Sequence, residues 1–247
     1  MTRLPYEPNQ QKFGRSKVDT VFRAALKDEK NLLRIVQLEV SDIYHKISLS
    51  TLLMMVKSGT IVSDNIVSAL SVTGVPSDRL MILLSKVVRG RIFTTDEIIK
   101  LLDKEHKFID SKQLEARAVD YQRKQMNKYW KKETKRFKDD VAASIRMSIR
   151  LGHTQKQAAA LLRRRVGVSE SRSTLIATDQ LLTAAAIADR RRQKQLGVTA
   201  YTWVTVGDSR VRPTHVAKDG EEFTWSSPGE KPGDAIRCRC RGIPILD

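Results

Sequence analysis

The sequence predicts a mainly α protein with a helical N-terminal domain, long central helices and a small C-terminal α+β module. Three observations predict this fold class. Apolar residues recur at helical spacing over residues 18–110, residues 111–151 contain neither glycine nor proline, and β-favouring and turn-forming residues dominate after residue 198. We therefore expect four regions: a flexible arm (1–17), a helical domain (18–110), a long basic helix with a helical lead-in (111–197) and a small β-containing module (198–247).

The arm is expected because residues 1–17 are polar, include Pro5 and Pro8, and offer too little apolar surface to offset the entropy of ordering them. The helical pattern then begins near residue 19 and continues to about residue 47.

Shorter helices are predicted to follow, separated by breaks at Gly59, at the turn 74–77 and at Gly90. Ser77 is a candidate N-cap for the helix after that turn. Thr94, with Glu97 three residues later, fits a capping box at the start of another helix.

The absence of glycine and proline from residues 111–151 predicts one helix with a length of about 60 Å, at a rise of 1.5 Å per residue. Its apolar stripe is narrow, and residues 112–138 carry ten Lys or Arg against three acids. These basic side chains form either a solvated helix face or a contact surface for DNA or an acidic protein. The candidate contact residues are Lys124, Lys128, Lys131, Lys132, Lys135 and Arg136.

The helical lead-in is predicted as two helices, one from Thr154 to Gly167 and one from Ser169 to Gly197, with Gly152 ending the long helix before them. Four more candidate contact residues lie in the last turns: Arg190, Arg191, Arg192 and Lys194. The negative end of the helix dipole is a sufficient structural reason for cations there.

The net charge of +17 and the pI near 10.1 predict an anionic partner. Residues 1–110 have 17 basic and 13 acidic side chains, whereas residues 111–247 have 28 and 15, so most of the excess lies in the second half. No recognition-helix or zinc-finger pattern occurs, so binding to double-stranded DNA is expected to be independent of sequence. No run of 18 apolar residues occurs, so no membrane association is expected.

The last fifty residues are too few to bury a large hydrophobic core, so we expect a further interaction to stabilise this module. His215, Cys238 and Cys240 supply three zinc ligands, and Asp208 is a candidate fourth, with Asp219 and Asp234 as alternatives. The alternative is that the thiols are reduced and buried, or oxidised between molecules. Three arginines alternate with the cysteines and would share one face of a strand: Arg237, Arg239 and Arg241.

Asp208, Arg210, Arg212 and His215 lie within eight residues, a grouping that could serve a metal-dependent nuclease. The sequence offers no independent second acid, no nucleophile motif, no Walker loop and no His-Glu-x-x-His. We therefore expect a protein that is not an enzyme, with the nuclease as the less favoured alternative.

The run Tyr201-Thr-Trp-Val-Thr-Val-Gly-Asp-Ser-Arg-Val-Arg-Pro-Thr-His, the Asp-Gly turn at 219–220, the Pro-Gly pair at 232–233 and the terminal Cys-Arg-Cys-Arg resemble the C-terminal domain of phage Mu F-like minor head proteins. The motif residues are Trp203, Asp208, Arg210, Arg212, His215 and Gly220. The family often has asparagine where Ile236-Arg237 stands, and Ala-Arg-Thr-Glu where this chain has Ala177-Thr-Asp-Gln. The resemblance covers roughly residues 141–247.

The resemblance implies a structural protein of the virion that acts in head morphogenesis of a tailed bacteriophage. The implied partners are the portal and the major capsid protein, and the implied location is the head interior or portal vertex, with the host cytoplasm as the site of assembly. A free packaging accessory protein that binds DNA without sequence preference is the alternative.

Overall fold

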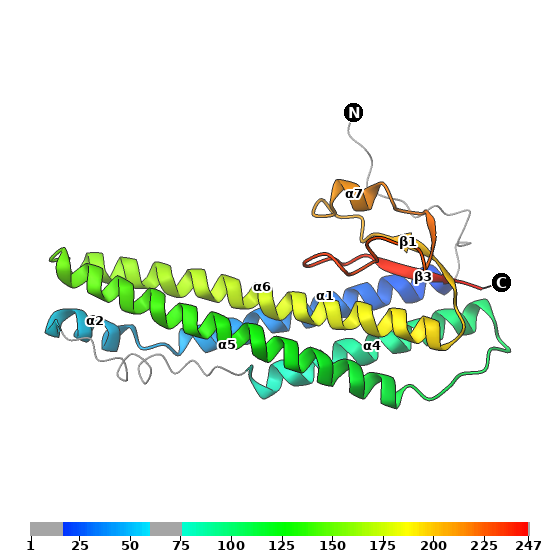
Figure 1. Ribbon diagram of the computed structural model, residues 1–247, viewed down its shortest axis with the longest axis horizontal. Helices are drawn as coiled ribbons and strands as arrows, with labels where there is room; N and C mark the ends of the chain where they lie inside the picture. The colour runs from blue at the N-terminus through cyan, green and yellow to red at the C-terminus, as the bar shows by residue number, and fades with distance from the viewer. Residues whose placement is uncertain (1–16, 60–75, 247) are drawn as a thin grey trace. The chain divides into compact units, whose positions relative to one another are not determined.

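The computed structural model describes residues 17–59 and 76–246 (Figure 1). In chain order the elements are α1 (Lys17–His45), α2 (Leu49–Ser58), α4 (Asp78–Leu102), α5 (Lys112–Arg150), α6 (Gln155–Gln195), β1 (Ala200–Val204), α7 (Pro213–Val216), β2 (Glu222–Thr224) and β3 (Arg241–Ile245). The mainly α prediction is therefore confirmed. Apart from Lys17, the predicted arm lies outside the described residues, as do residues 74 and 75 of the predicted turn. Among the described helices, none is long and apolar enough to cross a membrane.

The described chain forms two compact units. The sheet unit comprises residues 17–33, 82–122 and 179–246, and the helical unit comprises residues 34–59, 76–81 and 123–178. The unit boundaries fall inside α1, α4, α5 and α6, so each of these helices contributes residues to both units. The domain boundaries expected from the sequence stay predictions.

Several helix ends follow the local sequence signals. The Ser77 hydroxyl accepts a backbone N–H of the first turn of α4 at 3.3 Å. Thr154 and Gln157 cap α6 reciprocally: the Thr154 hydroxyl accepts the Gln157 N–H at 3.3 Å, and the Gln157 side chain accepts the Thr154 N–H at 2.9 Å. Gly152 and Gly197 adopt positive φ angles of 60° and 80° just after α5 and α6, which confirms both as helix stops.

Two predicted breaks were wrong. Gly90 and Thr94 lie inside the continuous α4, and the Thr94 hydroxyl donates to the Gly90 carbonyl at 2.8 Å instead of capping a new helix with Glu97. Likewise, Gly167 and Ser169 lie inside α6, which runs unbroken for 41 residues. An interior glycine costs a helix only about 1 kcal/mol, so burial of the flanking apolar residues outweighs it.

The β-favouring residues expected after residue 198 begin with β1, the centre of an antiparallel sheet with the order β2-β1-β3. Tyr201 pairs with Phe223 on one side and with Pro244 on the other. Three strands of three to five residues bury little surface, so the sheet depends on packing against helices.

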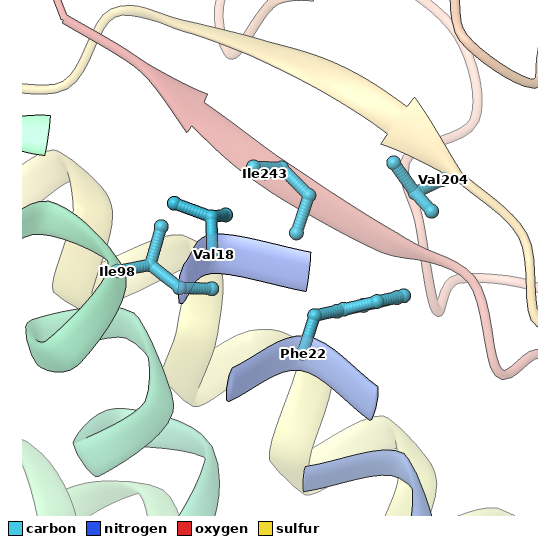
Figure 2. Close-up of a cluster of buried hydrophobic side chains, with 5 residues drawn as sticks. All are labelled: Val18, Phe22, Ile98, Val204 and Ile243. Carbon is cyan, nitrogen blue, oxygen red and sulfur yellow. The ribbon is translucent and has the colours of Figure 1, made fainter. Parts of the chain in front are cut away.

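That packing is visible within the sheet unit (Figure 2). Val204 and Ile243 of the sheet form a buried cluster with Val18 and Phe22 of α1 and Ile98 of α4. The cluster joins segments that are more than 200 residues apart in the chain. The sheet is therefore held in place by the first described helix.

The apolar stripe of α5 is as narrow as its sequence predicts. In the helical unit, Trp130, Phe137, Val141 and Ile145 of α5 are 2% exposed or less. Tyr129, which competes with Trp130 for the stripe in the sequence, is exposed. One buried stripe leaves the rest of the α5 circumference to polar and basic side chains.

Candidate functional site

Three of the predicted metal ligands meet in the sheet unit. His215 lies in the short helix α7, which begins with Pro213, and Cys238 and Cys240 lie just before β3. The Nδ1 atom of His215 is 3.6 Å from Cys238 Sγ and 3.4 Å from Cys240 Sγ. All three side chains are buried, and their ligand atoms lie within 4.8 Å of one another. This group could hold a metal ion.

The two thiols are not joined by a disulfide, and their ionisation is coupled. A hydrogen bond from the Cys240 thiol lowers the pKa of Cys238 to about 6, because it stabilises the Cys238 thiolate. The same hydrogen bond, with burial, raises the pKa of Cys240. The lowered pKa favours the thiolate form of Cys238, which is the form that binds metals.

The opposite nitrogen of His215 faces an acid that the sequence analysis missed. Its Nε2 atom is 3.2 Å from Glu230 Oε2, and the Lys218 ammonium lies 3.3 Å from the same oxygen. Although partial burial opposes ionisation, the Lys218 ammonium and the His215 ring hold the pKa of Glu230 below its ordinary value. Glu230 lies 15 residues after His215 in the sequence, and no sequence pattern predicts that two residues with this separation come into contact.

Asp208, the candidate fourth ligand, does not join this group. Its Oδ1 atom accepts a hydrogen bond from Arg239 at 2.7 Å, and its Oδ2 atom accepts one from Arg210 at 3.3 Å. Partial burial opposes ionisation, but Arg239 above all lowers the pKa of this carboxyl. Among the described residues, the group therefore contains two sulfurs and one nitrogen and no carboxylate.

The three arginines near the cysteines do not share a strand face, contrary to the prediction. Only Arg241 belongs to β3, and it is buried, while Arg239 binds Asp208. Arg237 has a φ of 55°, unusual for a residue with a side chain, and its backbone N–H donates to Asp179 at 2.7 Å. The chain turns at Arg237, so alternation along an extended strand does not apply there.

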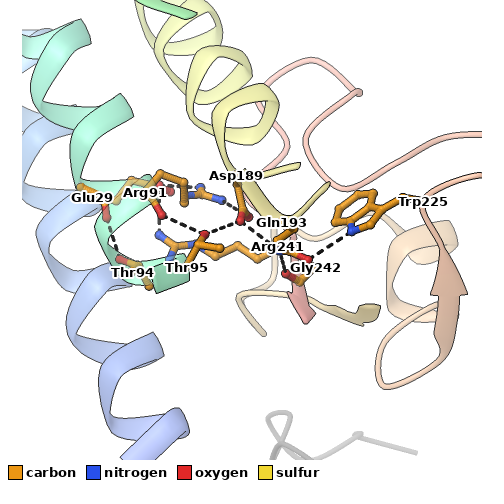
Figure 3. Close-up of polar contacts among 10 residues, drawn as sticks. Glu29, Arg91, Thr94, Thr95, Asp189, Gln193, Trp225, Arg241 and Gly242 are labelled. Carbon is orange, nitrogen blue, oxygen red and sulfur yellow. Dashed lines mark hydrogen bonds and ion pairs between the residues drawn. The ribbon is translucent and has the colours of Figure 1, made fainter. Parts of the chain in front are cut away.

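Arg241 belongs instead to a buried ionic quartet of the sheet unit, formed by Glu29, Arg91, Asp189 and Arg241 (Figure 3). Glu29 Oε2 accepts from Arg91 at 2.6 Å and from Arg241 at 3.1 Å, and Arg91 Nη1 lies 3.6 Å from Asp189. Burial opposes ionisation of Glu29, but the two guanidiniums lower its pKa below the ordinary value. Burial and repulsion by Arg91 lower the pKa of Arg241 to about 10.

Gln193 of α6 extends this network to the sheet (Figure 3). Its side-chain amide donates to Asp189 at 3.0 Å and to the Gly242 carbonyl at 2.7 Å, and it accepts the Trp225 indole N–H at 3.2 Å. Gln193 is fully buried, so each lost bond would leave an unsatisfied polar group. The network fastens β3 and the segment after β2 to α6.

The basic residues predicted as contacts fall into two groups. All six candidates on α5 are exposed, and they lie in the helical unit: Lys124, Lys128, Lys131, Lys132, Lys135 and Arg136. At the end of α6, Arg191 and Lys194 are exposed, and Arg190 pairs with Asp234 at 3.3 Å.

Arg192 differs from its neighbours because it is 2% exposed. It forms two hydrogen bonds with the Asp96 carboxylate, at 2.6 and 2.9 Å, and a third with the Ile109 carbonyl at 2.7 Å. The Arg192 guanidinium is therefore bonded to groups of the sheet unit and, being buried, is not exposed to a partner.

Other residues of the motif make contacts that position the segment around His215. Trp203 is fully buried in β1 and meets the His215 ring edge to face, with ring centroids 5.3 Å apart. The Gly220 N–H donates to the Trp203 carbonyl at 2.8 Å, and Arg212 donates to the Ile236 carbonyl at 2.7 Å. The motif thus positions α7 against β1 and against the segment that carries the cysteines.

Comparisons with known proteins agree with the motif. Residues 139–243 match the family described as Phage Mu protein F like protein. An uncharacterized protein of Haemophilus influenzae (strain KW20) is 32% identical over 114 residues, which are 45% of this chain and 26% of that protein. The chain thus spans about a quarter of the length of this relative. No solved structure matches. The match runs from α5 through α6 to β3 and confirms the resemblance of residues 139–243 to phage Mu F-like proteins.

Proposed function

We propose that this chain is a minor head protein of a tailed bacteriophage, a structural component of the virion that acts in head morphogenesis. The match over residues 139–243 carries the proposal, because it includes the Trp203, His215 and Cys-x-Cys elements that build the buried Cys-His group. In infected cells the protein assembles in the host cytoplasm with the portal and the major capsid protein.

Mass spectrometry of purified virions and of procapsids tests this role. The protein should be present in at least one of the two particles, and deleting its gene should give defective heads. Its absence from both particles would contradict the proposal and favour a free packaging accessory protein. A map of the virion without imposed symmetry would then locate it at the portal vertex or on the inner capsid surface.

Contact with packaged DNA is the second part of the proposal, and the exposed basic face of α5 supports it. Binding should be independent of DNA sequence, and the logarithm of affinity should fall with the logarithm of salt concentration by about 0.9 per phosphate neutralised. Replacing Lys128, Lys131 and Lys135 with glutamine should weaken binding and flatten this slope.

The matched control removes the same charge from exposed lysines elsewhere, by replacing Lys100, Lys104 and Lys107 with glutamine. If both triple variants lose affinity equally, net charge alone drives binding. If neither variant nor the unaltered protein binds DNA, an acidic protein surface is the better target for the α5 face.

A role without catalysis agrees with the pairing of the polar residues. Asp208 binds Arg210 and Arg239, while His215 faces Glu230 and two sulfurs, so the residues weighed for a nuclease divide into separate groups of contacts. Incubating the protein with DNA and divalent metals, beside a His215→Ala variant, tests this directly. Cleavage that the variant lacks would establish the nuclease.

Zinc is the metal we propose for the Cys-His group. Zinc at about 2.3 Å from sulfur and 2.0–2.1 Å from nitrogen, with tetrahedral angles, places sulfur and nitrogen about 3.5–3.6 Å apart. The two sulfur–nitrogen distances here are 3.6 and 3.4 Å, so the ligands already have this spacing. Bound zinc would link α7 to the segment before β3 and so stabilise a module with a small core.

Elemental analysis of the purified protein tests the zinc proposal. We expect about one zinc per chain, lost in a Cys238→Ser variant whose melting temperature is also lower. Metal-free protein with an unchanged melting curve in that variant would leave the alternative of buried, reduced thiols.

A further inference from the structure

Both ring nitrogens of His215 contact other side chains, and the two nitrogens face different kinds of groups. Its Nδ1 atom faces the sulfurs of Cys238 and Cys240, and its Nε2 atom faces the Glu230 carboxylate. The ring itself is 2% exposed and packs edge to face on Trp203. Water therefore has little access to either nitrogen, and these neighbours determine where the ring carries its proton.

A neutral imidazole has one N–H and one lone pair, and a nitrogen can bind a metal only through its lone pair. If the Nδ1 lone pair points at the sulfurs, the proton lies on Nε2 and needs an acceptor. Glu230 Oε2 is that acceptor at 3.2 Å. Carboxylates commonly hold metal-binding histidines in this way, and they fix both the tautomer and the ring orientation.

We propose that Glu230 is the positioning residue of the Cys-His metal centre: it holds the Nε2–H tautomer of His215 so that Nδ1 coordinates the metal beside the two thiolates. This inference rests on the proposed zinc site. Glu230 does not touch the metal, and its effect is exerted through the imidazole ring.

Glu230 is itself restrained. The Lys218 ammonium lies 3.3 Å from the same oxygen that faces His215, and it also lies 4.6 Å from the centre of the Trp203 ring. The Lys218 backbone N–H donates to the His215 carbonyl at 3.2 Å. Lys218 thus ties the carboxylate to the turn that carries His215, and its charge keeps the carboxylate ionised.

The competing arrangement is an imidazolium with both nitrogens protonated, paired with Glu230 on one side and with a thiolate on the other. Such a pair would stabilise the module without metal and would leave no lone pair for one. The two arrangements differ in the protonation of Nδ1, which nitrogen NMR of the histidine ring reports directly.

The experiment compares the full-length protein with Glu230→Gln, Glu230→Ala and the control Glu221→Ala, which removes an exposed carboxylate from the same module. Each protein is stripped of metal and titrated with Co²⁺, whose visible and sulfur charge-transfer bands report a thiolate site, and Zn²⁺ then competes for it. Glu230→Ala should bind about 10–100-fold more weakly, Glu230→Gln should be intermediate because it keeps an acceptor, and Glu221→Ala should match the unaltered protein.

Nitrogen NMR of the zinc-loaded protein should show a protonated Nε2 and a coordinated Nδ1. Two results would overturn the role of Glu230: Co²⁺ affinities of Glu230→Ala and the unaltered protein within twofold of each other, or coordination through Nε2. A failure of the unaltered protein to bind either metal would instead overturn the zinc site itself. If Glu230→Ala does not fold, the isosteric Glu230→Gln variant provides the comparison.

Discussion

Two basic regions of this protein use their charge in opposite ways. The α5 face carries five lysines and one arginine, all exposed, between residues 124 and 136. In the sheet unit, Arg91, Arg192 and Arg241 are each at least 96% buried and bound to carboxylates. These three arginines and their three carboxylates sum to zero, so the net charge of +17 is carried by other basic side chains, the exposed α5 face among them.

The guanidinium group is better suited than the ammonium group to the buried positions. The guanidinium is planar, weakly hydrated and has five donors in a fixed arrangement, so it can bridge two buried carboxylates. The lysine ammonium is compact and strongly hydrated, and it favours water at the end of a flexible stem.

The largest effect should come from breaking the buried quartet. Glu29→Ala leaves Arg91 and Arg241 buried without their shared acceptor, and removing one partner of such a group costs about 3–5 kcal/mol. Chemical denaturation measures the loss. The adjacent, exposed Asp28→Ala is the control, and equal losses in both variants would show that the quartet contributes nothing particular.

A smaller loss is expected from Asp96→Ala. This change removes two hydrogen bonds from the buried Arg192 but leaves its bond to the Ile109 carbonyl. We expect a loss of about 2–3 kcal/mol in the free energy of unfolding, since hydrogen bonds to charged groups contribute more than neutral ones. The exposed Glu105→Ala should change stability by less than about 0.5 kcal/mol.

Acid should weaken the quartet through Glu29. Its pKa in the folded protein is lowered, so its contribution is complete above the unfolded pKa of about 4.3 and is lost as pH falls through the folded value. Urea unfolding between pH 5 and pH 2 should show stability falling by up to about 1.4 kcal/mol per pH unit from this group. A Glu29→Gln variant with the same pH dependence would contradict this assignment.

The smallest effect on stability is expected on α5. Replacing Lys128, Lys131 or Lys135 singly with glutamine should change the free energy of unfolding by no more than about 0.5 kcal/mol, because these side chains are exposed. Thermal melts at low and high salt measure this. A loss above 2 kcal/mol would mean that the α5 lysines stabilise the fold, which would remove the contrast between the two regions.

Sequence patterns predicted the helix ends better than the helix interiors. Ser77, Thr154 and Gly197 act locally, through bonds and torsion angles within one turn, so their neighbours in the sequence reveal their role. Gly90 and Gly167 carry the same local signals for a break but lie inside helices that tertiary packing stabilises. Packing depends on segments distant in the chain, which a local window does not contain.

The sequence likewise predicted only those parts of the candidate site that local residue types reveal. Residue type alone identified His215, Cys238 and Cys240, because few other side chains bind zinc. Glu230 and the Glu29 carboxylate were missed, since acids are common on surfaces and only the fold brings these two to their partners. Asp208 was predicted as an oxygen ligand, but arginines bind it instead.

Arg237 shows how a motif can encode backbone shape rather than chemistry. Its left-handed conformation costs an ordinary residue roughly 1–2 kcal/mol, and asparagine, which the related pattern often has at this position, tolerates it well. The Arg237 side chain is exposed, so the position requires a turn and not a particular functional group. Searches for related sequences should therefore accept residues other than asparagine directly before Cys-x-Cys, provided that they can adopt this backbone conformation, and should rely instead on the histidine and the two cysteines.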